Sequence, residues 1–291
     1  MATKKDEPTS GKTDVVNVTQ GAMAPSFMGD EDFGGSVGFE GADKDSFAIP
    51  FLQVLQKMSP MVDEDDPKHV AGAKAGMLYN TVTQKLYDGK DGLIVIPCFY
   101  KRSYIQWGGR EAADGGFKGE FTPEQIVEMQ TKGEIVPVEG KLLKPLADGS
   151  THDKKSDYFA DTRSHFILIY DPATGEIGQA ILALSSSQVK ASKMLMTALQ
   201  QKKVDTPRGK QTPPTFANMV KLTTFGQSNE KGSWSAVRFD LDGLVTDAGV
   251  FAEAKAFYKA ILAGEVSVDH NKSGNEATGN VADAPTTADN F

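Results

Sequence analysis

Rings and cations alternate within one short stretch of this chain, residues 98–110. The four rings are Phe99, Tyr100, Tyr104 and Trp107, and the three cations are Lys101, Arg102 and Arg110. Aromatic rings can stack on nucleic-acid bases, and cations can follow the phosphates of a single strand. Aromatic residues are equally typical of a buried strand. The stretch could therefore form a surface for single-stranded nucleic acid or an ordinary core strand. We predict that it presents nucleic-acid contacts from Tyr100, Lys101, Arg102, Tyr104, Trp107 and Arg110.

A second group of cations lies at the end of a predicted helix and in the Pro-rich loop that follows it. Its members are Lys190, Lys193, Lys202, Lys203, Arg208 and Lys210. We predict nucleic-acid contacts for the last four of them, because a basic loop can bind phosphates. The alternative is that lysines at a helix C-terminus merely complement the helix dipole.

A third group repeats the pairing of rings with cations on a predicted hairpin. Lys221 and Phe225 lie on its first strand, and Trp234 and Arg238 lie on its second strand. Because side chains alternate along a strand, Trp234, Ala236 and Arg238 should share one face. We predict that Trp234 and Arg238 contact nucleic acid.

The excess negative charge of the chain lies in its ends. Residues 1–46 carry nine acids and four lysines, and residues 269–291 carry four acids and one lysine. The net charge of the whole chain is −8, so the part between these ends is neutral (−8 + 5 + 3 = 0). Polar segments of this kind bury too little apolar surface to fold. We therefore expect a disordered acidic segment over 1–45, one globular domain over 46–266 and a disordered acidic tail over 267–291.

The last three residues, Asp289, Asn290 and Phe291, form an acidic end that closes with an aromatic ring. A terminal ring with its carboxylate can dock into a basic pocket of a partner protein. We expect these residues to recruit a partner, and the alternative is an ordinary disordered end.

Signals for catalysis are missing from the sequence. Cys98 is the single cysteine, and no two of the four histidines have metal-ligand spacing. His165 follows an apolar strand pattern, which favours a structural role. The N-terminus lacks the apolar run of a signal peptide, and no apolar stretch is long enough to cross a membrane. We expect a cytoplasmic protein that is not an enzyme and uses no cofactor and no metal.

Periodicity and turn residues predict an α+β, β-rich domain. Expected helices cover 50–58, 122–132, 185–203 and 247–262, and expected strands cover 77–83, 93–100, 101–107, 163–170, 176–184, 218–225 and 233–241. Pro97 should mark an edge strand or a bulge. Short strands separated by turns fit a small OB-like or Greek-key barrel with helical insertions.

Four segments carry a resemblance to a known group of proteins. They are Ile49–Pro60, Gly76–Thr83, Tyr87–Gly89 and Val95–Trp107. Residues 46–240 resemble early-region proteins of tailed bacteriophages, and the resemblance implies single-stranded DNA binding in replication and recombination, in the cytoplasm of the bacterial host. The end of the chain is similar to the tails of single-strand binding proteins, which implies phage or host replication and recombination proteins as partners.

Three hypotheses follow from these signals. The leading one is a phage protein that protects single-stranded DNA by base stacking and phosphate contacts, with possible self-association left open. The second is a host-takeover or anti-defence factor that binds a host protein. The third is a nuclease or recombination enzyme that uses scattered carboxylates and Mg²⁺.

Overall fold

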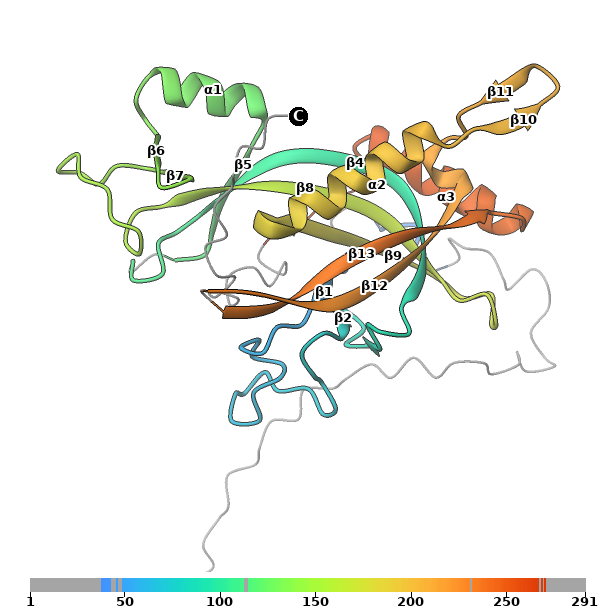
Figure 1. Ribbon diagram of the computed structural model, residues 1–291, viewed down its shortest axis with the longest axis horizontal. Coiled ribbons are helices and arrows are strands. Elements are labelled where there is room, and N and C mark those ends of the chain that lie inside the picture. The colour runs from blue at the N-terminus through green and yellow to red at the C-terminus, as the bar shows by residue number, and fades with distance from the viewer. Residues whose placement is uncertain are drawn as a thin grey trace, which may run out of the picture.

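The computed structural model describes residues 38–42, 46, 49–112, 115–230, 232–266, 268 and 270. The large sheet comprises β4 (Leu93–Trp107), β5 (Phe117–Phe121), β6 (Val136–Val138), β7 (Lys141–Leu143), β8 (Tyr158–Tyr170), β9 (Ile177–Ser185), β12 (Asn218–Asn229) and β13 (Gly232–Leu244). The small sheets comprise β1 (Leu52–Val54), β2 (Leu78–Asn80) and β3 (Leu86–Tyr87), and β10 (Val204–Thr206) and β11 (Gly209–Gln211). The α-helices are α1 (Pro123–Thr131), α2 (Val189–Gln201) and α3 (Ala248–Leu262). This arrangement confirms the predicted α+β, β-rich class (Figure 1).

The long antiparallel pair of β4 and β8 runs through the whole large sheet. At one end β12 pairs with β4 and β9 pairs with β8, and at the other end β5 pairs with β4 and β7 pairs with β8. The β4–β8 register shifts between Pro97 and Phe99. Since proline has no N–H to donate, a bulge lets it lie in a central strand. The predicted irregularity at Pro97 is thus a bulge.

The predicted closed barrel is wrong. The ladder order is β13-β12-β4-β8-β7-β6, and no strand pair in the described part of the chain joins the sheet into a ring. Instead, residues 50–56 lie between two edge strands of the large sheet, β9 and β13. The Ile181 N–H of β9 donates to the Pro50 carbonyl at 2.8 Å, and the Gln56 amide bonds both backbone groups of Ser235 on β13, at 3.0 and 2.8 Å. A loop and a side chain therefore satisfy edge groups that a barrel would pair strand to strand.

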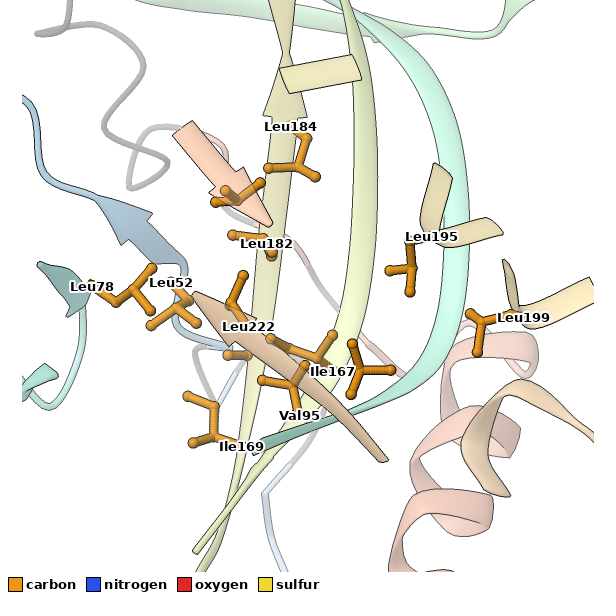
Figure 2. Close-up of a cluster of buried hydrophobic side chains, with 13 residues drawn as sticks. Leu52, Leu78, Val95, Ile167, Ile169, Leu182, Leu184, Leu195, Leu199 and Leu222 are labelled. Carbon is orange, nitrogen blue, oxygen red and sulfur yellow. The ribbon is translucent and has the colours of Figure 1, made fainter. Parts of the chain in front are cut away.

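Different helices cover the two faces of the β4–β8 pair. On one face, Leu195 and Leu199 of α2 join a core cluster that contains Leu182, Ile167 and nine other buried strand residues (Figure 2). On the other face, α3 packs against Ile96 and Leu168. Each fully buried leucine contributes about 1.5–3 kcal/mol relative to an exposed one. These two layers hold the middle of the long strands rigidly.

The starts of α1 and α3 follow their sequence signals. Thr122 caps α1 in a reciprocal capping box with Gln125, and the Asp247 side chain accepts from the Val250 N–H at the start of α3. The predicted helix over 185–203 is present as a 3₁₀ turn (Ser186–Gln188) followed by α2.

Two local predictions are wrong. The predicted helix over 50–58 is β1 followed by turns, because Phe51 bonds both the side chain and the backbone of Thr81, which holds the chain extended. The predicted loop after α2 contains the β10–β11 hairpin.

Candidate nucleic-acid interface

The exposed cations of β4 are paired with carboxylates from neighbouring strands. Lys101 Nζ lies 2.8 Å from Glu120 Oε2 on β5. The Arg102 guanidinium donates to both carboxylate oxygens of Asp161 on β8, at 3.1 and 3.0 Å. The β4 cations therefore face water as predicted, but their charge is already balanced within the protein.

The tyrosines of β4 belong to the same polar network. Arg163 of β8 donates to the Tyr100 hydroxyl at 2.9 Å and to Asp161 at 2.9 Å. Arg102 donates to the Tyr104 hydroxyl at 3.0 Å and lies over the Tyr104 ring. Both tyrosines are partly buried and both hydroxyls accept hydrogen bonds. The network cross-links β4 and β8, and it uses the polar groups that a strand of DNA would have to contact.

The prediction that Trp107 presents an exposed ring is wrong. Its exposed fraction is 2 %, and its ring packs edge-on against Phe117 with centroids 6.1 Å apart. The sequence pattern misled because Trp107 alternates with polar Gln106, yet both residues are buried near the end of β4. Trp107 is a core residue in this structure.

His270 covers the outer end of the Lys101–Glu120 pair. Its ring stacks on Phe117 with centroids 5.2 Å apart, and its Nε2 atom lies 3.7 Å from Glu120 Oε2. Burial acts to raise the pKa of Glu120, but the nearby polar groups of His270, Lys101 and Ser103 lower it to about 2. Glu120 therefore stays ionised and keeps Lys101 engaged at neutral pH.

The region around α2 has the opposite charge balance. Between Ile177 and Asn229 the chain has one acid, Asp205, and seven cations: Lys190, Lys193, Lys202, Lys203, Arg208, Lys210 and Lys221. In the described residues none of the seven forms an ion pair with a carboxylate. This segment is the strongest concentration of uncompensated positive charge in the described part of the chain.

The face of α2 that points away from the core carries part of this charge. Ser192, Leu195 and Leu199 are buried, so the opposite face presents Lys190, Lys193 and the 65 % exposed Met194. Ser192 also fixes the helix to the sheet, since its hydroxyl lies 2.7 Å from Nε2 of buried His165. The lysines therefore project from α2, whose position is set by its packing against the core.

The cations that follow α2 along the chain form two groups. Lys202 Nζ donates to the Gly243 carbonyl of β13 at 2.7 Å, and Lys203 Nζ donates to the Thr212 hydroxyl at 2.5 Å. Arg208 and Lys210 lie on the exposed β10–β11 hairpin. Only neutral acceptors hold Lys202 and Lys203, so their charges remain available to an anion.

The β12–β13 hairpin presents rings and cations on one face, as predicted. Phe225 lies opposite Ala236, and Thr223 lies opposite Arg238. Phe225 is 42 % exposed, Trp234 is partly exposed, and Arg238 is exposed beside Asp240 at 3.1 Å. Ala236 of the predicted face is buried. Phe225 and Lys221 lie outside the predicted contact residues, and their pairing of a ring with a cation on one strand is the sequence signal that points to them.

The remaining predicted site residues lie elsewhere. Arg110 is exposed in the loop after β4, where its charge helps a hydrogen bond from Lys141 to lower the pKa of Asp153. The predicted partner-binding end, Asp289, Asn290 and Phe291, lies outside the described residues, as do most residues of the two predicted acidic tails.

The described residues also bear on metal binding and membrane insertion. No group of three or more histidine, cysteine or acidic side chains is arranged to hold a metal ion there. No helix in the same part of the chain has the length and apolarity to span a bilayer. Cys98 is buried, and burial raises the pKa of its thiol to about 12.

Comparisons with known proteins identify one family. Neither the curated proteins nor the solved structures include a match to this chain. A model of the Pam3 phage gp34-like protein family matches residues 18–267. Because the match spans well over half of the sequence, this chain is a bacteriophage protein that belongs to the Pam3 phage gp34-like family.

Proposed function

We propose that this protein is a non-enzymatic single-stranded DNA-binding protein whose phosphate contacts come from α2 and its flanking strands. The observation that supports this proposal is the segment between Ile177 and Asn229, where seven cations accompany one acid and none is ion-paired in the described residues. Free cations gain affinity by displacing counterions from phosphates. Cations that are already paired would first have to give up a carboxylate.

Stacking would come from the β12–β13 hairpin, on the face opposite to the one that packs with α2. Phe225 is the large ring most available there, with Trp234 beside it across the hairpin and Lys221 and Arg238 on the same face. A base stacked on an aromatic ring contributes about 1–3 kcal/mol. We therefore move the proposed stacking role from Trp107 to Phe225 and retain Trp234.

The proposal keeps the biological role expected from the phage family. Single strands exposed during replication and recombination would be bound and protected by this surface. The β4 residues Tyr100, Lys101, Arg102 and Tyr104 would support the sheet and join the contact only if their internal pairs open, and Arg110 would lie at its periphery.

The test is a fluorescence titration of the full chain with a labelled single-stranded oligonucleotide over a series of salt concentrations. The test variant replaces four unpaired lysines, Lys190, Lys193, Lys203 and Lys221, by Gln. The control replaces four ion-paired lysines, Lys101, Lys118, Lys132 and Lys141, by Gln. Both variants remove the same charge. We expect the test variant to lower the salt slope by about 3, at about 0.7 per lost phosphate contact, and the control to leave it nearly unchanged.

Two results would contradict the proposal. An equal loss in both variants would mean that net charge alone drives binding. No binding by the wild-type chain at low salt would overturn single-strand binding altogether. In that case a host protein that co-purifies after nuclease treatment would support the host-takeover alternative.

Phe225→Ala tests the stacking role separately. The loss of one stacked base should weaken binding by about 1–3 kcal/mol at every salt concentration, without a change in salt slope. Leu262→Ala, which truncates another exposed apolar side chain, is the control. If Phe225→Ala binds as tightly as wild type, the ring is not a stacking platform.

A further inference from the structure

The β10–β11 hairpin stands apart from the rest of the fold. It forms its own two-stranded sheet and extends away from the body beyond the end of α2 (Figure 1). All three residues of β11 are exposed, and so are Pro207 and Arg208 at the tip. Two-stranded hairpins without a hydrophobic face are marginal on their own. A projecting arm of this kind gains little stability from its own packing. Its role in the protein must therefore come from a molecule that it contacts.

The tip of the arm is nevertheless well organised. Pro207 takes the second position of the turn and Gly209, with φ of +95°, takes the last, as such turns favour. The Thr206 hydroxyl donates to the Gly209 carbonyl at 2.7 Å and accepts from the Arg208 N–H at 3.2 Å. The guanidinium of Arg208 has no partner among the described residues. The turn therefore presents a proline and an unpaired arginine together at the far end of the arm.

The base of the arm is anchored to α2. Thr212, just after β11, accepts from Lys203 and donates its hydroxyl to the Gln200 carbonyl at 3.2 Å. Asp205 is the only acid on the arm and pairs in register with Lys210. Lysine on an exposed edge disfavours pairing with another strand. The arm is thus poorly suited to strand addition and well suited to a polyanion.

We infer that the β10–β11 hairpin is a groove-binding arm for duplex nucleic acid. Known β-ribbon proteins place their strands in the major or the minor groove of a duplex. Its tip, a proline beside an arginine, has the residue types that enter a narrow minor groove, where proline can wedge between base steps and arginine meets the strong negative potential. Taken with the proposed function, on which this part rests, α2 would hold a single strand while the arm contacts an adjacent duplex. The protein would then favour junctions between single and double strands.

The experiment compares three labelled DNAs with the full chain: a single strand, a blunt stem-loop duplex, and the same stem-loop with that single strand as an overhang. The arm variant carries Pro207→Ala and Arg208→Ala. The control variant carries Pro172→Ala and Lys90→Ala, which likewise remove one proline and one positive charge, from two other exposed turns. We expect wild type and control to bind the overhang substrate about tenfold more tightly than the single strand, in line with one arginine contact. The arm variant should lose that gain, so that it binds the overhang substrate no more tightly than the single strand.

The outcomes separate the two proposals. Equal wild-type affinity for the single strand and the overhang substrate would overturn the arm and leave single-strand binding standing. A uniform loss on all three DNAs in the arm variant would make the hairpin a single-strand contact and would also overturn the duplex inference. Binding of the blunt duplex alone, lost in the arm variant, would support the arm and overturn the proposed single-strand function.

Discussion

Two basic regions of this protein carry similar residues and differ in their electrostatic state. On β4, Lys101 and Arg102 lie within hydrogen-bond distance of Glu120 and Asp161. On α2 and the strands after it, seven cations share one acid and form no ion pair within the described residues. The first region joins strands together, and the second remains free to bind an anion. A count of cations along the sequence is therefore a poor guide to phosphate binding unless their acidic neighbours are known.

The rings of the two regions differ in the same way. Trp107 is buried against Phe117, whereas Phe225 is 42 % exposed. Trp107→Ala should lower the free energy of unfolding by about 3–5 kcal/mol, because it leaves a cavity in the core. Phe225→Ala should change it far less. Urea unfolding of both variants measures the difference, and equal losses would mean that the two rings have the same structural role.

The pH dependence of stability should also come from the β4–β8 pair, through His165 of β8. Burial, followed by the charge of Arg163, lowers the pKa of His165 from 6.5 to about 4. As the pH falls from 6.5 towards 4, the unfolded chain binds a proton that the folded chain excludes. The free energy of unfolding should therefore fall by up to about 3 kcal/mol over this interval.

His165→Gln keeps a polar partner for Ser192 and removes the titration, so urea unfolding at several pH values should show a flatter profile for this variant. Lys193→Gln on α2 should leave the wild-type profile intact. An unchanged pH dependence in His165→Gln would assign the effect to another group. At lower pH, Glu120 should dominate, since its stabilising contribution is present above 4.5 and is lost as the pH falls towards about 2.

The smallest expected effect tests whether ion pairing alone keeps the β4 cations from binding phosphate. Glu120→Gln removes the carboxylate that holds Lys101 while preserving the shape of the side chain. If Lys101 then reaches a phosphate, the salt slope of single-strand binding should rise by about 0.7. Glu128→Gln, which frees Lys132 on α1, is the matched control. A rise of equal size in both variants would show a general charge effect and would weaken the comparison.

Much of the local structure could be predicted because its causes lie close together in the sequence. The capping box of Thr122 and Gln125, the Asp247 cap and the hairpin of β12 and β13 each depend on residues within a few positions or across one turn. The prediction of a helix over 50–58 is wrong because a distant residue, Thr81, holds Phe51 in an extended conformation. The barrel was wrong for the same reason, since the contact between Gln56 and Ser235 joins residues that are 179 positions apart.

The sequence by itself determined three features of this protein. They are an acid-poor segment with seven cations, two groups of rings beside cations, and an α+β alternation of helices and strands. Tertiary structure alone decided which of those groups were free. Asp161 meets Arg102 across 59 positions, and Glu120 meets Lys101 across 19. The physical reason is that an ion pair needs its two charges within about 4 Å of each other, and only strand pairing sets which charges come that close.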